Sequence, residues 1–269
     1  MIEKLFENHL AKWSMYRLEK FSNIHHGETC YIFGDGPSLK WFDIKNFSNH
    51  PAICCNLLPF HNDFEKLDVK YCLMMEPWIF APKIIQPNIR YVTEFREIAK
   101  LYLRKLKAYP EKQFFVHISN YFNLRGSNIN YTYRFLPRIG NKTDKLLQLI
   151  KPFSGSFYGA LTLAYFMGFS KAYLIGHDAW TIQPSRNRHW YEKGEGDLFE
   201  PKNFAFDLLD IISNKMQLFT ITNDGDSCNV KAISYQTFCR KPPLYKENTQ
   251  LLHRELLDVL ATYPEYNIR

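Results

Sequence analysis

The chain has 269 residues, of which 46% are hydrophobic, 16% aromatic and 23% charged, and its formal net charge is +7 at pH 7. This composition excludes a disordered or collagen-like chain and fits one large globular domain, or a domain with a lid. The positive charge suits a nucleotide, an anionic sugar or a negatively charged membrane face as partner. Zinc-finger spacing, a homeodomain-like helix and aromatic RNA-binding signatures are missing from the sequence, so nucleic acid is not expected.

The cysteines and the N-terminus predict a reduced, cytoplasmic protein. No Cys-x-x-Cys pair occurs, and most of the six cysteines lie in apolar runs, which is typical of reduced core residues. They are Cys30, Cys54, Cys55, Cys72, Cys228 and Cys239. The N-terminus lacks a secretory signal, and no window approaches the roughly 18 apolar residues of a membrane-spanning helix. Any work at a membrane is therefore expected to be peripheral, from its inner face.

In the first half of the chain, short apolar runs alternate with polar turns. Residues 2–22 have helical spacing and predict an amphipathic helix that packs on the main domain or meets a partner. The strands expected at 52–56 and 69–75 end at Asn56 and Glu76, a pattern typical of a parallel sheet that binds ligands at the carboxyl ends of its strands. The other elements expected here are a strand at 29–33, a glycine-rich turn and helix start at 34–40, a helix at 95–106 and a strand at 113–118.

The second half continues the alternation of strand and helix. Helices are expected at 143–150, 157–167 and 204–215, and strands at 172–175 and 218–222, with Gly168 as a helix C-cap. The polar stretch 179–196 has little periodicity and is a candidate lid. The order of elements predicts an α/β fold with a doubly wound, mostly parallel sheet.

Two turns are candidates for binding an anion. The Gly34 to Lys40 loop precedes an expected helix N-terminus, where backbone N–H groups and the helix dipole favour a phosphate. It lacks the third glycine of a dinucleotide fingerprint and the Gly-Lys-Ser/Thr of a Walker loop, and the alternative is a tight turn without ligand. The second candidate, Ser154-Gly155-Ser156, precedes another expected helix and is either a simple cap or a second contact for the same ligand.

Three polar clusters have catalytic or metal-binding alternatives. His189 lies in a polar segment with arginines and aromatics, so it is either a general base or a solvated loop histidine. His177 precedes Asp178 at a strand end, where it orients the loop or pairs with that carboxylate. The Asp224-Gly225-Asp226 sequence is either a pair of ligands for a divalent metal or an Asx-rich turn, and its Asn and Ser neighbours favour the turn.

The sequences Ile32-Phe33-Gly34-Asp35-Gly36-Pro37-Ser38-Leu39 and Tyr173-Leu174-Ile175-Gly176-His177-Asp178 resemble a known family. They are similar to the bacterial lipooligosaccharide sialyltransferases of glycosyltransferase family 42. They are equally similar to the flagellin-glycosylation, or motility accessory factor, family, whose wider group includes archaeal hydroxymethylpterin pyrophosphokinases. The order of motifs is kept over about residues 28–235 of this chain. The resemblance implies a Rossmann-like fold, a variant of the GT-A type, with a small lid.

The resemblance also implies roles for individual residues. His189 would be the general base for the acceptor hydroxyl, and Tyr191 or Tyr158 would assist the leaving phosphate. Asp35 replaces the usual asparagine of the family, and Glu76 stands where the sialyltransferases tend to have another asparagine. The residues expected to contact a cytidine-monophosphate sugar donor or to shape its pocket are Gly34, Asp35, Gly36, Ser38, Asn56, Glu76, Ser154, Gly155, Ser156, Gly176 and Asp178.

The resemblance predicts a glycosyltransferase that moves a sialic-acid-like sugar from a CMP donor to a cell-surface glycan or lipooligosaccharide acceptor. Inversion, metal independence and the absence of a cofactor are part of that prediction. The alternatives are a pterin pyrophosphokinase that uses ATP and Mg²⁺, and a non-catalytic scaffold in glycan assembly. The sequence leaves open a homo-oligomer and a peripheral membrane contact. The domains expected are an N-terminal helix at 1–28, a nucleotide-sugar-binding core at 29–178, a lid carrying the base at 179–200, and a C-terminal part at 201–269 that completes the core.

Overall fold

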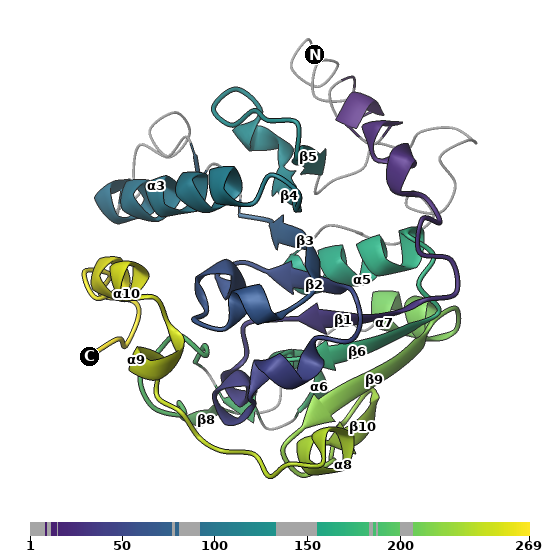
Figure 1. Ribbon diagram of the computed structural model, residues 1–269, viewed down its shortest axis with the longest axis vertical. Coiled ribbons are helices and arrows are strands. Elements are labelled where there is room, and N and C mark those ends of the chain that lie inside the picture. Colours follow the sequence, from purple (N-terminus) through teal and green to yellow (C-terminus); the bar gives the residue numbers. More distant parts are fainter. Residues whose placement is uncertain are drawn as a thin grey trace.

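The fold is built on a parallel sheet that passes through the middle of the molecule (Figure 1). The computed structural model describes residues 9, 12–14, 16–76, 79–80, 92–132, 155–182, 185–186, 188–199 and 207–269. Within them, eight strands lie in the order β10-β9-β6-β1-β2-β3-β4-β5, and every neighbouring pair is parallel. The strands are β1 (Thr29–Phe33), β2 (Ala52–Cys55), β3 (Val69–Met74), β4 (Gln113–His117), β5 (Ile129–Thr132), β6 (Lys171–Ile175), β9 (Gln217–Thr222) and β10 (Lys231–Ser234).

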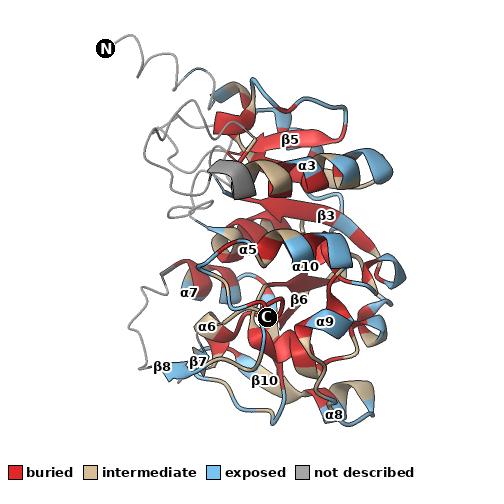
Figure 2. Cartoon of the chain, turned by 90° about the vertical axis from the view of Figure 1, so that its left-hand side faces the viewer, coloured by how far each residue is buried: buried red, intermediate tan, exposed pale blue. Residues whose placement is uncertain are grey.

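The sheet is buried on both faces, which explains why its central strands are continuous apolar runs. Alternate residues of β1 enter different cores: Tyr31 and Phe33 lie in one cluster, and Cys30 and Ile32 in the other. Helices α3 (Val92–Ala108) and α10 (Arg254–Leu260) contribute to the first core and contact each other, whereas α5 (Ser156–Phe166) and α7 (Asp207–Ser213) contribute to the second. Strand β5 is buried along its length even though it ends the sheet (Figure 2). The protein therefore has the predicted doubly wound α/β fold.

The strand order reverses next to β1. From β1 the chain adds β2, β3, β4 and β5 on one side, and after α5 it returns to place β6 on the other side of β1, followed by β9 and β10. The carboxyl ends of β1 and β6 therefore form a topological switch point, which is where open parallel sheets bind their ligands. The loops that follow these two strands are the two motifs with the family resemblance.

Most expected elements agree with the structure, one differs and one is not tested. The expected helices at 95–106 and 157–167 correspond to α3 and α5, and Gly168 ends α5 with a positive φ of 88°. The helix expected after Gly34-Asp35-Gly36 is instead a five-residue 3-10 helix, Pro37–Trp41. The helix expected at 143–150 lies outside the described residues. The expectation missed β5, β10 and the short helices α8 (Tyr235–Cys239), α9 (Asn248–Leu251) and α10. Around the expected lid it also missed the short helix α6 (Asp178–Thr181) and the two-residue strands β7 (Ser185–Arg186) and β8 (Leu198–Phe199), which pair with each other.

The N-terminal segment packs on the main domain where it is described. Residues 12–14 and 16–17 are helical, and a 3-10 helix follows at Glu19–Phe21. The ring of Trp13 lies 5.4 Å from the ring of Tyr121 and 6.3 Å from that of Tyr131 in β5. Trp13 therefore packs on the core, and contact of this segment with a partner stays a prediction.

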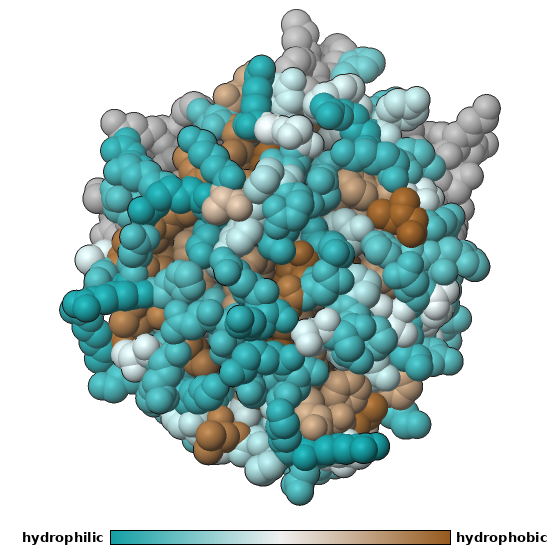
Figure 3. All heavy atoms as spheres, viewed as in Figure 1, coloured by the Kyte–Doolittle hydropathy of each residue, from teal (hydrophilic) through white to brown (hydrophobic). Residues whose placement is uncertain are grey.

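The surface and the cysteines complete this picture. The face shown in Figure 3 is mainly hydrophilic, and no helix in the described ranges is long and apolar enough to cross a membrane. Four of the expected core cysteines are buried, and burial raises the pKa of three of them, Cys30, Cys54 and Cys55. The expectation was wrong for Cys228, which is exposed, and Cys239 is only half-buried.

Candidate functional site

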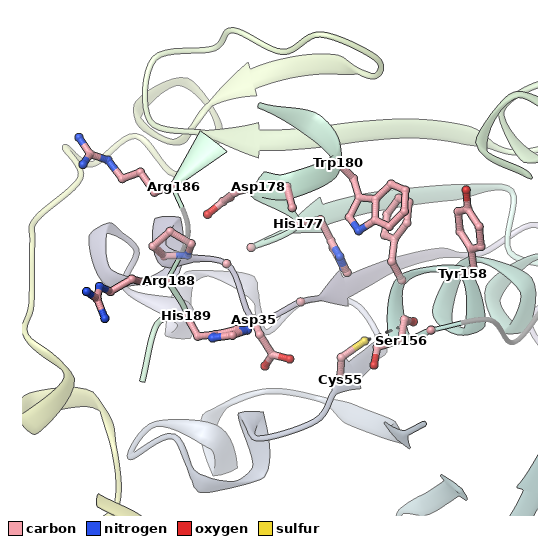
Figure 4. Close-up of a pocket in the computed structure, with 17 residues that line it drawn as sticks. Asp35, Cys55, Ser156, Tyr158, His177, Asp178, Trp180, Arg186, Arg188 and His189 are labelled. Carbon is pink, nitrogen blue, oxygen red and sulfur yellow. Dashed lines mark hydrogen bonds between the residues drawn. The ribbon is translucent and has the colours of Figure 1, made fainter. Parts of the chain in front are cut away.

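A cavity of about 550 Å³ opens at the switch point between β1 and β6. Its walls come from the loops after these two strands, the start of α5, and three residues further along the chain, Arg186, Arg188 and His189 (Figure 4). Aromatic side chains lie at one end and two arginines at the other, with Asp35 and His189 between them. The lining residues are Gly34, Asp35, Gly36, Pro37, Cys55, Gly155, Ser156, Phe157, Tyr158, Gly176, His177, Asp178, Ala179, Trp180, Arg186, Arg188 and His189.

The two motif loops are locked together by backbone contact. The N–H of Gly36 donates to the carbonyl of Gly176 at 2.6 Å. Ser38 donates twice to Asp178, from its backbone N–H to Oδ2 at 2.7 Å and from its hydroxyl to Oδ1 at 2.6 Å. Asp178 is buried, and burial raises the pKa of its carboxyl group against these two hydrogen bonds. The hydrogen bonds described for Ser38 thus go to Asp178, and contact of either residue with a ligand stays a prediction.

Gly36 has an ordinary φ of −67°, so its need for glycine is one of space. A Cβ at this position would overlap the Asp178 carboxylate and the Gly176 carbonyl. We expect Gly36→Ala to lower the free energy of unfolding by about 1–3 kcal/mol, because the loop must move off a hydrogen-bonded carboxylate. Urea denaturation measures this. Gly126→Ala is the matched control, since its Cβ would lie 3.1 Å from the Ile129 side chain and 3.2 Å from Asn128 Oδ1, without the overlap found at Gly36. An equal loss in both variants would contradict the expectation.

A hydrogen-bonded chain connects three of the expected site residues. The Ser156 hydroxyl donates to Asn56 Oδ1 at 3.0 Å, and Asn56 Nδ2 donates to Asp35 Oδ2. Asn56 has a φ of +42°, a strained value for a residue other than glycine that persists where the surroundings enforce it. Burial raises the pKa of Asp35, although the charge of His189 and the hydrogen bond from Asn56 act in the opposite direction. The loop after β1, the end of β2 and the start of α5 are thereby held in one arrangement.

His189 has a carboxylate partner that the sequence analysis missed. Its Nδ1 lies 2.8 Å from Oε1 of Glu192, which also accepts from the backbone N–H of His189 at 3.0 Å. The other oxygen of Glu192 accepts from the backbone N–H of Asn267 at 3.1 Å and lies 3.4 Å from Arg188 Nη1. Burial would raise the pKa of Glu192, but the hydrogen bonds from His189 and Asn267 outweigh it and hold the pKa below its usual value. A charged carboxylate on Nδ1 fixes the proton there and leaves Nε2 free to accept another.

The segment that carries His189 is fastened to the rest of the molecule. The backbone N–H of Trp190 donates to the Asp35 carbonyl at 3.1 Å, and that of Lys193 donates to the Asn267 carbonyl at 2.6 Å. The buried Lys40 ammonium donates to the carbonyl of Gly194 at 2.5 Å. The indole of Trp190 is fully buried. Closure of residues 179–200 as a lid stays a prediction, and residues 188–194 are held against the core in this structure.

His61 supports the buried Trp190 indole, with 5.2 Å between the ring centres. Burial lowers the pKa of His61 to about 3, against about 6.5 in an unfolded chain. A depressed histidine pKa contributes stability above pH 6.5 that is lost as the pH falls toward 3. When the pH falls from 7 to 5, we expect the free energy of unfolding of the wild type to decrease by about 1–2 kcal/mol more than that of the His61→Gln variant. Buried carboxyl groups contribute equally to both proteins, so the difference between the wild type and the variant removes their opposing effect. Urea denaturation at each pH measures this difference, and an equal decrease in the two proteins would contradict the expectation.

The aromatic end of the cavity offers a flat apolar wall. The rings of Phe157 and Trp180 stack at 4.9 Å with an angle of 15°, and Tyr158 lies 5.2 Å from Trp180. His177 is also part of this wall, 4.9 Å from Phe157, and burial lowers its pKa to about 3. It is not hydrogen-bonded to Asp178, whose described partner is Ser38. The expected pairing of His177 with that carboxylate is therefore wrong.

A second cavity, of about 480 Å³, adjoins the first. Four residues line both cavities: Asp35, Gly155, Ser156 and His189. Of the other expected residues, Tyr191 and Glu76 line the second cavity, whereas Tyr158 lines the first. His189 stacks on Tyr191 with ring centres 4.8 Å apart and an angle of 4°. The candidate base therefore lies where two binding spaces meet.

Two candidates from the sequence remain, Ser154 and the Asp224-Gly225-Asp226 sequence. Ser154 is outside the described residues. Asp224 Oδ1 accepts from the backbone N–H of Asp226 at 3.0 Å, which is the Asx turn that the sequence favoured. No group of three or more His, Cys, Asp or Glu side chains that could hold a metal ion occurs in the described ranges.

Comparisons with known proteins add the following. No family model matches the chain, and a search of curated proteins finds no significant match. Among solved structures, the chain is similar to the sialyltransferase CstII from Campylobacter jejuni in complex with a substrate analogue, cytidine-5'-monophosphate, with 14% identity, a TM-score of 0.45, and coverage of 90% of this chain and 99% of that chain. It is also similar to the sialyltransferase CST-II in complex with a trisaccharide acceptor and CMP, with 14% identity, a TM-score of 0.41, and coverage of 89% and 100%. Likeness at this level carries no weight for function, and the α/β fold follows from strand order and pairing.

Proposed function

We propose that this protein is a glycosyltransferase that moves a sialic-acid-like sugar from a CMP donor to a hydroxyl of a cell-surface glycan, with inversion and without a metal. The observation that carries the proposal is the His189–Glu192 pair at the junction of two cavities, beside the switch point of the sheet. A transferase needs two adjacent binding spaces and a base between them. The sequence motifs add the nucleotide-sugar class through their resemblance to family 42 sialyltransferases.

The first cavity suits the donor. Its aromatic wall of Phe157 and Trp180 provides a flat surface for a nucleobase. The N-terminus of the 11-residue helix α5 reaches both cavities at Gly155 and Ser156, where backbone N–H groups and the helix dipole favour the negative charge of a phosphate. These donors would stabilise the CMP leaving group, with assistance from Tyr158 or Tyr191.

The reaction follows from the position of the base. The acceptor hydroxyl, held in the second cavity, gives its proton to Nε2 of His189, and its oxygen attacks the anomeric carbon of the donor sugar. The bond from that carbon to the phosphate oxygen breaks, and its electron pair leaves with CMP. Attack on the face opposite to the leaving group inverts the anomeric configuration. Glu192 stabilises the imidazolium that forms, because its charge lies on the Nδ1 side of the ring.

The pyrophosphokinase alternative would use Asp35, Glu76 and Asp178 to hold Mg²⁺ and ATP. Both oxygens of Asp178 already accept hydrogen bonds from Ser38, which gives this carboxylate a structural role. The geometry therefore favours the transferase.

Calorimetric titration separates the two functions. The purified protein is titrated with CMP and with ATP, each in EDTA and in Mg²⁺. The proposal predicts that CMP binds equally well under both conditions. Binding of ATP only in the presence of Mg²⁺, without binding of CMP, would overturn the transferase and favour the pyrophosphokinase.

A further inference from the structure

The second cavity has a distinctive combination of surfaces. Its floor is apolar and is formed by side chains that include Met75, Ile79 and Ile98. Tyrosine rings add a further wall: Tyr191 and Tyr266 lie 5.5 Å apart at 87°, and Tyr263 is 5.3 Å from Tyr266. Flat aromatic faces and apolar side chains suit the C–H face of a sugar ring.

The ionisable groups other than tyrosine that line this cavity are mostly acidic. Asp35, Glu76 and Glu265 contribute carboxyl groups, and among the described lining residues the only basic side chain is His189. Burial raises the pKa of Tyr266, the hydrogen bond with Tyr191 lowers it, and the negative charges of Asp35, Glu192 and Glu76 raise it. Three carboxyl groups thus line one cavity.

Asp35 lines both cavities next to His189. Its Oδ2 accepts from Asn56 Nδ2, and hydrogen bonds from the Trp190 side chain and the Leu57 backbone act with it against the effect of burial on the Asp35 pKa. This carboxyl group therefore lies beside the candidate base at the junction of the two cavities.

We propose that the second cavity selects an acceptor without negative charge, a neutral or amine-bearing sugar, and disfavours acceptors that carry a carboxylate or phosphate. This inference rests on the proposed transferase function. Glu76 and Glu265 are the specificity-determining side chains, because both line the cavity without belonging to the His189–Glu192 pair. Two carboxylates repel an anionic acceptor and attract an amine across the same distance.

The test compares methyl β-lactoside, an amine-bearing analogue and 3'-sialyllactose as acceptors, by transfer and by calorimetric binding to the CMP-bound protein. We expect kcat/KM for the neutral acceptor to exceed that for the sialylated one by about tenfold or more at low salt, and the preference to narrow at high salt. In Glu76→Gln/Glu265→Gln, the ratio of the two kcat/KM values should fall by about tenfold. Glu111→Gln is the matched control, because this exposed glutamate lies at the amino end of β4 and should leave the ratio unchanged.

The outcomes separate the inference from the function on which it rests. Transfer that prefers the sialylated acceptor, or a ratio that the double variant does not change, overturns the inference and leaves the transferase intact. If CMP binds but transfer is too slow to measure, the inference is tested by comparing how tightly the neutral and the sialylated acceptor bind to the CMP-bound protein. A protein that neither binds CMP nor transfers sugar overturns both.

Discussion

His189→Ala is expected to lower the rate of sugar transfer by about 10²–10⁴ while CMP binding is retained. The loss follows from removing the side chain that lies between the two cavities and takes the proton of the acceptor hydroxyl. Retained binding follows because the aromatic wall and the start of α5 remain in place. Initial rates of CMP release with a saturating acceptor measure the first effect, and calorimetry measures the second.

His26→Ala is the matched control, because His26 is exposed in the loop before β1 and should leave transfer unchanged. If His189→Ala transferred sugar at the wild-type rate, another group would have to act as the base. If the wild type and His189→Ala both bound CMP but transferred no sugar, the scaffold alternative would be favoured.

Glu192→Gln is expected to lower kcat/KM by about 10- to 100-fold, because the imidazolium formed during transfer loses its negative partner. The glutamine retains the shape of the side chain and an oxygen that can accept from the Nδ1 side. Nucleotide binding should change little, since Glu192 does not line the donor cavity. Initial rates of transfer at several acceptor concentrations measure the first effect, and calorimetric titration with CMP measures the second.

Glu195→Gln is the control for this variant. Glu195 lies three residues further along the same segment, is half-exposed, and pairs with Arg186 at 3.4 Å. We expect Glu195→Gln to keep the wild-type kcat/KM. An equal loss of kcat/KM in the two variants, or no loss in Glu192→Gln, would contradict the role of the Glu192 charge.

The sheet could be predicted from the sequence where its strands are continuous apolar runs. Strands such as Thr29–Phe33 and Ala52–Cys55 are buried on both faces, so each position carries an apolar or small side chain. β5 and β10 were missed for the opposite reason. β5 contains Asn130 and Thr132, whose polar groups find hydrogen-bond partners inside the fold, and β10 is a partly exposed edge strand.

The candidate site was only partly predictable because its chemistry depends on contacts between distant segments. The turn after β1 was recognised, but the hydrogen bonds that fix it join Ser38 to Asp178, residues 140 positions apart in the sequence. His189 was found through its polar surroundings. Glu192 was missed although it lies only three residues away, since its orientation depends on Asn267 near the other end of the chain.

The most direct measurement of the central claim is mass spectrometry of a lactoside acceptor incubated with CMP-sialic acid and the protein in EDTA. The account predicts a product heavier by one sialyl residue, formed together with one CMP, and absent when His189→Ala replaces the wild type. An unchanged acceptor, with CMP-sialic acid intact and no binding of CMP by the protein, would contradict it.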